Sequence, residues 1–302
     1  MMHAGQRIAK GLVARAGTLW PKTTADFAFR LFTRSARRKG TSGTTGMPEG
    51  VRPLMLQHAG GLVATWDMPS AQPIGRKALL VHGWNSRSLH LLALARSLND
   101  AGIDTVLLDL PGHGASTGRH LHLGKGIEAV DAAWRHHGPF DVMIGHSFGG
   151  AVVLNTALGS AMCVPARRPK RLVTIGAPNS LPALFRWFGR RIGLPPVAQE
   201  ALERRVLSLL GRSLDLFVAG DQLADTDLPV LVIHDMDDTD VLYTDALRMA
   251  RAGRHVRLHT TSGLGHRRVL RDEGVHAAIA AYVTAGQDDA DEKPIALVRD
   301  YA

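Results

Sequence analysis

Two serines in this chain lie in a Gly-x-Ser-x-Gly pattern, which places a nucleophilic serine on a sharp turn between a strand and a helix. Residues 145–149 follow the apolar stretch FDVMI and precede the apolar stretch AVVLNTAL, so a strand, a turn and a helix are predicted in that order. Residues 114–118 follow a Pro-Gly turn and precede no predicted helix. The context therefore favours Ser147 as a nucleophile and Ser116 as an ordinary loop residue.

A serine hydroxyl attacks a carbonyl group efficiently only when a base removes its proton. Among the 15 histidines, His266 lies in the loop SGLGH, directly after the last predicted strand. Three other late histidines fall within a predicted strand or helix, where a structural role is expected: His255, His259 and His276. His266 is therefore the predicted base.

The base needs a carboxylate that orients its ring. The loop after the predicted strand LPVLVIH offers four carboxylates: Asp235, Asp237, Asp238 and Asp240. From the residues alone, the choice among these four stays open.

An attack on a carbonyl group also requires N–H donors for the negative charge that develops on its oxygen. The backbone N–H of Phe148 directly follows the predicted nucleophile and is one candidate. The second candidate is the N–H of Trp84, which lies in the loop HGWN after the predicted strand ALLVH. These two residues are the predicted oxyanion hole.

Strands and helices that could position these groups alternate between residues 51 and 284. The predicted strands are 51–57, 61–66, 78–82, 103–110, 140–145, 171–177, 228–234 and 255–260. The predicted helices are 89–101, 124–137, 151–158 and 271–284. Continuous Val, Ile and Leu strands of this kind predict an α/β fold with a mostly parallel sheet that helices cover on both faces.

About fifty residues separate the strand that ends near Gly176 from the strand that begins at Leu228, whereas a crossover needs only about a dozen. The surplus predicts a small helical cap at about 178–226, over the sheet edge where α/β folds bind ligands. Trp187 and Phe188 in this cap are predicted to bind substrate. The alternative is that they only fix the cap to the core.

Together these motifs resemble the α/β-hydrolase superfamily from about residue 51 to residue 284. The matching stretches are VHGW, DLPGHGAS, GHSFGG, HDMDDTDV and GLGH. The resemblance implies Ser147 as nucleophile, Asp238 as acid and His266 as base, with Trp84 and Phe148 as oxyanion donors. HDMDDTDV differs from the superfamily pattern H-G-x-x-D-x-x-V because an aspartate replaces the glycine.

The resemblance implies a serine hydrolase that cleaves a carboxylic ester or thioester of a small-molecule acyl substrate through an acyl-enzyme on Ser147. It implies no metal and no organic cofactor. Acyl transfer, amide cleavage and carbon–carbon bond hydrolysis on the same residues stay open, as does a non-catalytic ligand-binding module. DLPGHGAS marks the fold, so Asp109 and His113 are expected to be structural.

Composition limits the class of protein further. Apolar residues make up 45% of the chain and charged residues 21%, as in packed globular proteins. The single cysteine, Cys163, cannot form an internal disulfide or a Cys-rich zinc site. No apolar run is long enough for a membrane span, and we expect a cytoplasmic protein.

The net charge of +9 is concentrated near the N-terminus. Residues 1–50, a predicted basic helical arm and joint, carry nine Lys and Arg against two acidic residues. Residues 286–302 form an acidic tail that we expect to be mobile, and residues 51–285 form the predicted hydrolase domain. This distribution does not predict a nucleic-acid partner. The arm could pack on the domain or contact an anionic membrane peripherally, and the oligomeric state stays open.

Overall fold

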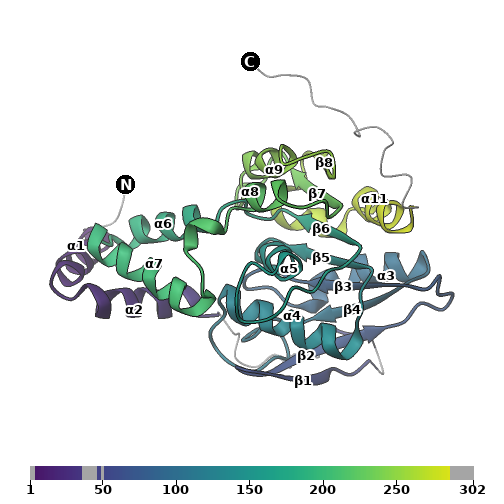
Figure 1. Ribbon diagram of the computed structural model, residues 1–302, viewed down its shortest axis with the longest axis horizontal. Coiled ribbons are helices and arrows are strands. Elements are labelled where there is room, and N and C mark those ends of the chain that lie inside the picture. Colours follow the sequence, from purple (N-terminus) through teal and green to yellow (C-terminus); the bar gives the residue numbers. More distant parts are fainter. Residues whose placement is uncertain (1–3, 36–45, 49–50, 286–302) are drawn as a thin grey trace, which may run out of the picture.

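The computed structural model describes residues 4–35, 46–48 and 51–285, and an eight-stranded sheet forms its centre (Figure 1). The strands are β1 (Leu54–His58), β2 (Gly61–Met68), β3 (Arg76–Val81), β4 (Ile103–Leu108), β5 (Val142–His146), β6 (Arg171–Ile175), β7 (Val230–Asp235) and β8 (Val256–Thr261). Their spatial order is β1-β2-β4-β3-β5-β6-β7-β8. β2 pairs antiparallel with β1 and β4, and all other pairs are parallel. The predicted fold class is confirmed.

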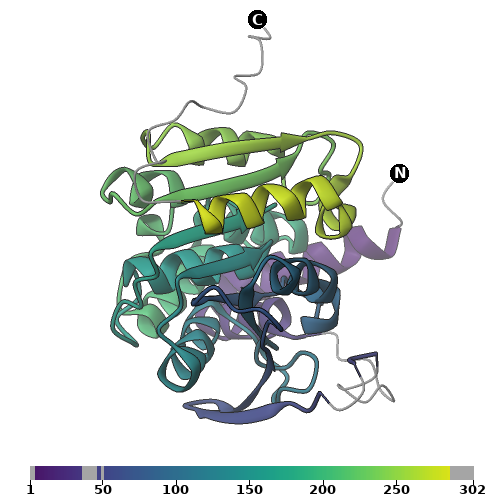
Figure 2. The ribbon, with the colours of Figure 1, turned by 90° about the vertical axis from the view of Figure 1, so that its right-hand side faces the viewer.

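Helices cover both faces of this sheet because both faces of its central strands are apolar. In β3, Leu79 and Val81 join one buried cluster, and Ala78 and Leu80 join the other. The first cluster contains residues of α4 (Leu123–His137), α5 (Phe148–Leu158) and α9 (Tyr243–Ala250). The second contains residues of α3 (Leu92–Asp100) and α11 (Glu273–Thr284), which lie in front of the sheet in Figure 2.

Helix α9 is the one of these helices that the sequence did not predict. It has eight residues and directly follows the acid-rich loop. Only Ala246 and Met249 in it are buried. Two buried positions are too few to form a recognisable helical period.

The connection from β6 to β7 contains the cap. Its helices are α6 (Leu181–Ile192), α7 (Pro196–Leu210) and α8 (Ala219–Ala224). Gly193 and Gly211 end α6 and α7 with positive φ angles of 83° and 71°, which glycine adopts without strain. The helical insertion predicted from the spacing between Gly176 and Leu228 is therefore present.

The N-terminal arm consists of two helices, α1 (Ala4–Leu19) and α2 (Pro21–Thr33), which we call the N-terminal hairpin. α2 packs along α7, and α1 contacts α6 and α7. Gly17 is buried against Pro195, since a Cβ atom at Gly17 would lie 2.7 Å from the Pro195 Cγ. The hairpin and the cap thus form one group of helices beside the sheet (Figure 1).

Two predicted segments fall outside the described residues. Most of the predicted joint after the hairpin is not described, and neither is the acidic tail at 286–302. Among the described helices, none combines the length and the apolar character that crossing a bilayer requires.

Candidate active site

The turn from β5 to α5 holds Ser147 in a conformation that side chains rarely adopt. Its φ and ψ angles are 52° and −123°, and the glycines around it allow the strand and helix to approach closely. A Cβ atom at Gly149 would collide with the backbone of Val81 and His82 at the end of β3. Backbone strain of this kind is stored where a functional group must be held in place. The sequence context of Ser147 predicts this turn correctly.

The predicted base and one of the four candidate acids form a direct pair. His266 Nδ1 donates a hydrogen bond of 2.6 Å to Asp238 Oδ2. The other carboxylate oxygen of Asp238 accepts from the backbone N–H groups of Asp240 and Val241 at 2.8 and 2.9 Å. Burial alone would raise the pKa of Asp238, but the hydrogen bonds from His266 and these N–H groups lower it below its usual value. Asp238 is therefore held as a carboxylate beside the ring.

The remaining aspartates of this loop have other contacts. Asp235 accepts a hydrogen bond of 2.7 Å from the Thr261 hydroxyl and another of 3.0 Å from the Leu264 N–H. Asp237 accepts from the Gly263 N–H at 2.7 Å. Both carboxylates thus tie the acid loop to the loop that carries the base, whereas Asp240 is exposed. The sequence did not reveal this tie, because nothing in it shows which loop faces which.

The residue before Ser147 links the nucleophile turn to the loop that carries the base. His146, directly before Ser147, donates from Nε2 to the backbone carbonyl of His266 at 2.8 Å. Burial lowers the pKa of His146 to about 3, so its ring is neutral. In this structure, the Ser147 hydroxyl makes no hydrogen bond to His266. Such contacts are often long in the absence of substrate and tighten when one binds.

The loop after β3 is fixed by two buried histidines. His82 donates to the Gly83 carbonyl at 2.7 Å and accepts from the Leu110 N–H at 3.0 Å, and burial lowers its pKa to about 3. His113 accepts from the Asn85 N–H at 3.1 Å. A Cβ atom at Gly83 would lie 2.8 Å from the Ser147 Cβ, so the loop runs directly beside the predicted nucleophile.

The two predicted oxyanion donors lie next to each other at this loop. The rings of Trp84 and Phe148 are 5.3 Å apart and nearly perpendicular. Ser147 is the residue before α5, and its side chain caps no N–H group of that helix. Within the described residues, neither the Trp84 nor the Phe148 N–H donates to a protein acceptor. Phe148 is also the first residue of α5, and a helix N-terminus stabilises negative charge.

The second Gly-x-Ser-x-Gly pattern has a structural role. Ser116 is fully buried, accepts from the Ala64 N–H at 2.8 Å and donates to the Asp109 carbonyl. The Asp109 carboxylate accepts from the N–H groups of Ser88 and Ala115 at 2.7 and 3.0 Å. These bonds hold the loop after β4, in agreement with the roles expected for Ser116 and Asp109.

An apolar pocket of about 440 Å³ opens beside the predicted oxyanion donors and under the cap; we call it the cap pocket. Its lining residues come from the N-terminal hairpin, the sheet edge and the cap: Phe29, Phe32, Trp84, His122, Leu123, Phe148, Leu181, Leu184, Phe185, Val206, Leu209, Leu210 and Leu214. His122 is the only polar member, and burial lowers its pKa to about 4, so it too is neutral.

The two cap residues predicted to bind substrate lie outside the lining of the cap pocket. Trp187 does not line it: its ring is 51% exposed and lies under the Arg191 guanidinium, which is 5.6 Å from the ring centre. Phe188 does not line the pocket either, but it packs against the lining residue Phe32, with 4.7 Å between the two ring centres. Leu184 and Phe185, one turn earlier in α6, face the pocket instead.

Phe29 and Phe32 of α2 are two lining residues whose place at the pocket the sequence did not predict. Their rings pack against the cap: Phe32 lies 4.7 Å from Phe185, and the Arg205 guanidinium lies 5.8 Å from the Phe29 ring centre. The helical period of the arm was visible in the sequence. Its position under the cap was not, because more than 150 residues separate Phe32 from Phe185.

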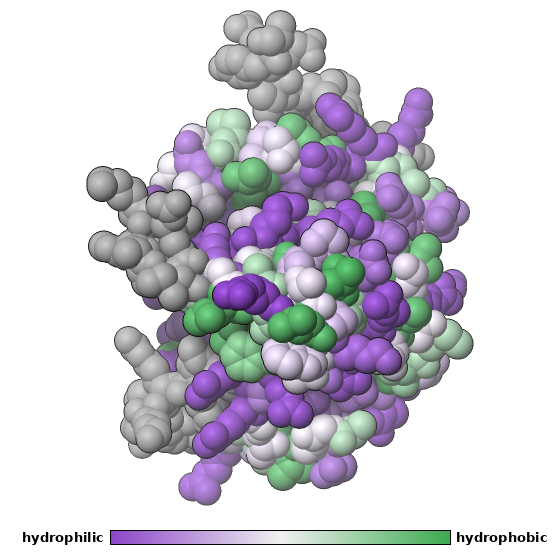
Figure 3. Space-filling model, turned by 90° about the vertical axis from the view of Figure 1, so that its left-hand side faces the viewer, coloured by the Kyte–Doolittle hydropathy of each residue, from purple (hydrophilic) through white to green (hydrophobic). Residues whose placement is uncertain are grey.

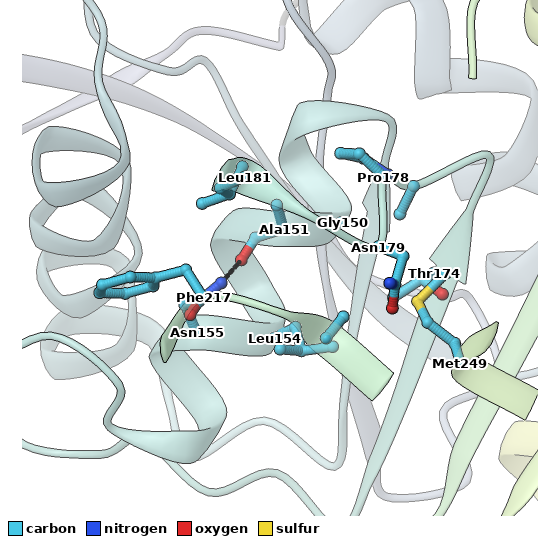
Figure 4. Close-up of a pocket in the computed structure, with 12 residues that line it drawn as sticks. Gly150, Ala151, Leu154, Asn155, Thr174, Pro178, Asn179, Leu181, Phe217 and Met249 are labelled. Atoms are coloured by element: carbon cyan, nitrogen blue, oxygen red, sulfur yellow. Dashed lines mark hydrogen bonds between the residues drawn. The ribbon is translucent and has the colours of Figure 1, made fainter. Parts of the chain in front are cut away.

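A second hollow, of about 260 Å³, lies between α5 and the start of the cap (Figure 4). Ala151 and Asn155 of α5 line one side, where the Asn155 amide donates to the Ala151 carbonyl at 2.8 Å, and Thr174 and Asn179 lie opposite. The predicted oxyanion donors Trp84 and Phe148 line the cap pocket but not this hollow. The cap pocket is therefore the candidate for substrate.

The described residues contain no group of three or more His, Cys, Asp or Glu side chains arranged to hold a metal ion. The acid-rich loop is already engaged with its own backbone and with the base loop. Ser147, Asp238 and His266 all lie at one edge of the sheet.

Comparison with known proteins agrees with this architecture. Residues 78–279 match the alpha/beta hydrolase family, and the chain belongs to that family. Comparison with curated proteins finds no match.

Several solved structures share the fold at low sequence identity. An esterase from Pyrococcus furiosus, Pf2001, is 16% identical with a TM-score of 0.60, and the match covers 83% of this chain and 98% of that one. Est1E from Butyrivibrio proteoclasticus is 19% identical with a TM-score of 0.56, covering 76% and 95%. A meta-cleavage product hydrolase from Pseudomonas fluorescens is 16% identical with a TM-score of 0.56, covering 77% and 97%. At these identities the similarity shows the fold alone.

Proposed function

We propose that this protein is a serine hydrolase that cleaves carboxylic esters or thioesters with an apolar acyl group. The observation that carries the proposal is the 2.6 Å hydrogen bond between His266 Nδ1 and Asp238 Oδ2 at the sheet edge that also holds the strained Ser147 turn. An aspartate that fixes the tautomer of a histidine beside a serine is the arrangement that activates a serine for acyl transfer.

In the proposed reaction, His266 Nε2 takes the hydroxyl proton while Ser147 Oγ bonds to the carbonyl carbon of the substrate. The oxygen of that carbonyl becomes negatively charged and accepts hydrogen bonds from the Trp84 and Phe148 N–H groups. The tetrahedral intermediate then expels the alcohol or thiol, which takes the proton from His266. Asp238 stays ionised throughout and stabilises the protonated ring.

Water completes the proposed cycle. It gives one proton to His266 and attacks the acyl-enzyme carbonyl, and the Ser147 oxygen leaves with that proton. The carboxylic acid is released and the free serine is restored. Every bond broken is matched by one formed, and no metal or redox partner takes part.

The cap pocket supports an apolar acyl group. Trp84 and Phe148 line it, so the acyl chain of a substrate whose carbonyl sits between their N–H groups would extend into it. Its single polar side chain, His122, is neutral and supplies no charge that would compensate a charged acyl group. A structure of Est1E has ferulic acid bound, which shows that a related fold accommodates an aromatic acid.

A fluorophosphonate probe and a graded series of p-nitrophenyl esters test the proposal. We expect the wild-type protein to be labelled and to hydrolyse the esters, the Ser147→Ala variant to lose both properties, and the Ser116→Ala variant to be labelled if it folds. Absence of labelling in the wild type would instead support a non-catalytic binding module. Label on Ser116 would show that the turn has been assigned to the wrong serine.

A further inference from the structure

The N-terminal hairpin exposes large apolar side chains on the side that faces away from the cap. Five such side chains are from 47% to 67% exposed: Leu12, Leu19, Trp20, Phe27 and Leu31. The opposite side of α2 is buried, with Ala25, Ala28 and Phe29 packed inward. Large apolar side chains that are exposed close together often mark a surface that contacts a partner.

The spacing of these residues places them in stripes along the helices. Leu12 and Leu19 are seven residues apart on α1, and Trp20, Phe27 and Leu31 are spaced by seven and four, so each set shares one helical face. Leu19 and Trp20 are consecutive at the junction of the two helices, so the stripes meet there. Figure 3 faces this end of the molecule and shows hydrophobic side chains near the middle of the face, interspersed with hydrophilic ones.

The charge around these stripes is almost entirely positive. Residues 4–35 hold six Lys and Arg and one acidic residue, Asp26, a net charge of +5. Asp26 is already paired with Arg205 of α7 at 3.4 Å. Five cations form no ion pair within the part of the chain that the structure describes: Lys10, Arg15, Lys22, Arg30 and Arg34.

The cations lie next to the apolar stripes. Arg15 falls between Leu12 and Leu19 on the same face of α1. Arg30 follows Phe27 by three residues on α2, and Arg34 lies directly after the end of that helix. This surface has exposed Trp, Phe and Leu side chains flanked by unpaired Lys and Arg. It is complementary to the surface of a lipid bilayer, whose headgroups are anionic and whose acyl chains lie just beneath them.

We propose that the N-terminal hairpin docks this protein on anionic phospholipid membranes. The apolar stripes enter the boundary between headgroups and acyl chains, and the flanking cations pair with lipid phosphates. A second copy of this chain fits the surface less well, because it would bring two sets of unpaired cations together.

Docking would also place the cap pocket close to lipid. α2 carries the exposed Phe27 and Leu31 on one side and the pocket-lining Phe29 and Phe32 on the other. Resting on the proposed function, this arrangement points to membrane-borne acyl esters or thioesters as substrates. The docking itself does not depend on catalysis.

Vesicle co-sedimentation of the full chain tests the docking. Vesicles of equal parts phosphatidylglycerol and phosphatidylcholine should bind the protein at low salt, and phosphatidylcholine vesicles should bind it about tenfold or more less tightly. Raising the salt to about 0.5 M should weaken binding, since salt screens the attraction. The Ser147→Ala variant should bind like the wild type, so a failure of catalysis is distinguishable from a failure of docking.

Two double variants separate the apolar from the ionic contribution. Trp20→Ser with Phe27→Ser, and Arg30→Gln with Arg34→Gln, should each weaken binding about tenfold or more. The matched controls are Ile74→Ser, which is 52% exposed before β3 at the other edge of the sheet, and Arg251→Gln with Arg254→Gln, which are exposed before β8. The controls should bind like the wild type.

Three results would overturn the docking proposal. The first is wild-type protein that ignores phosphatidylglycerol vesicles at low salt. The second is a loss in the control variants equal to the loss in the hairpin variants, with circular dichroism and thermal unfolding showing all of them folded. The third is a dimer in sedimentation equilibrium that the Trp20→Ser/Phe27→Ser variant abolishes in the absence of vesicle binding.

Discussion

Different interactions hold two neighbouring regions of the molecule together. Hydrogen bonds fix the acid and base loops at the sheet edge, whereas apolar contacts form the cap pocket beside them. At the sheet edge, Asp235, Asp237 and Asp238 accept hydrogen bonds of 2.6 to 3.0 Å from residues 261–266, which fix the position of the base loop. The cap pocket is closed by apolar side chains from the hairpin, α6 and α7, with His122 as its only polar member. Hydrogen bonds fix atoms in a definite geometry, whereas apolar contacts are non-directional and scale with area. A substitution that changes a single hydrogen-bonding atom should therefore affect activity most in the acid and base loops. A substitution that changes side-chain volume should affect activity most in the cap pocket.

The largest effect is expected from Asp238→Asn, which changes one atom of the acid. An asparagine would keep the size of the side chain but could not hold the His266 ring in the same tautomer or stabilise its charge. In a serine protease with this arrangement, the equivalent change lowers turnover about 10⁴-fold. We expect a loss of about that size in kcat for a small activated ester, with the fold retained.

Two neighbouring aspartates provide the controls. Asp240→Asn alters an exposed side chain and Asp237→Asn weakens the contacts with Ser262 and Gly263, so we expect losses of about tenfold or less. A severe loss in Asp237→Asn together with a nearly normal Asp238→Asn would show that the acid has been wrongly assigned.

A smaller, substrate-dependent effect is expected from Phe32→Ala in the cap pocket. Phe32 packs against Trp84, Phe185 and Phe188, so its loss removes apolar surface from the pocket wall. We expect kcat/KM to fall about tenfold for esters with long apolar acyl groups and to change little for acetate.

Phe27→Ala provides the matched control for Phe32→Ala, because Phe27 lies on the opposite, exposed side of the same helix. Its activity on dissolved esters should equal that of the wild type. Equal losses for acetate and long-chain esters in Phe32→Ala would mean that the phenylalanine stabilises the cap without contacting substrate.

The titration of His122, the polar residue of the cap pocket, should make the stability of the protein depend on pH. The pKa of His122 is about 4 in the folded chain and about 6.5 in the unfolded chain, so between these values the unfolded chain binds one more proton. Lowering the pH through this window should reduce the free energy of unfolding by about 1.4 kcal/mol per pH unit for this residue.

His122→Asn removes this titration while keeping an acceptor at the start of α4, where His122 accepts from the Lys125 N–H. Urea unfolding between pH 7 and pH 5 should therefore show a shallower loss of stability in the variant. An identical slope in both proteins would mean that His122 is protonated in the folded state.

The smallest effect is expected from Trp187→Ala. Trp187 is half exposed and contacts Arg191 instead of the cap pocket. We expect the acyl-chain preference to stay within about twofold of the wild type, since surface substitutions rarely change more. A marked shift in preference would place Trp187 at the substrate after all and would indicate that α6 moves when substrate binds.

The sequence predicted the sheet and the ends of its strands because each of these features is local. A short apolar run identifies a buried strand, and glycines around Ser147 identify the turn that follows one of them. The strand ends also predict which residues meet, since the carboxyl ends of parallel strands share an edge. The pairing of His266 with one particular aspartate came from family resemblance and not from the residues themselves.

The parts that the sequence did not predict depend on contacts between distant segments. Phe32 and Phe185 meet only because the N-terminal hairpin folds back on the cap, and neither has a local pattern that identifies the other. The same holds for Asp237 and Gly263, whose hydrogen bond joins two loops. The sequence also did not show that Leu184 and Phe185, and not Trp187, line the cap pocket, because the period of a helix shows which residues share a face but not which face is buried.

The hydrogen bond from His146 to the His266 carbonyl links the nucleophile turn to the base loop through a single rigid ring. A displacement of the β5–α5 turn would therefore carry the base loop with it, and the spacing between the two reacting groups would change less than either position. The thermal motions of these two loops should therefore be correlated. Small fluctuations of the sheet edge would then preserve the alignment of Ser147 and His266, on which proton transfer depends.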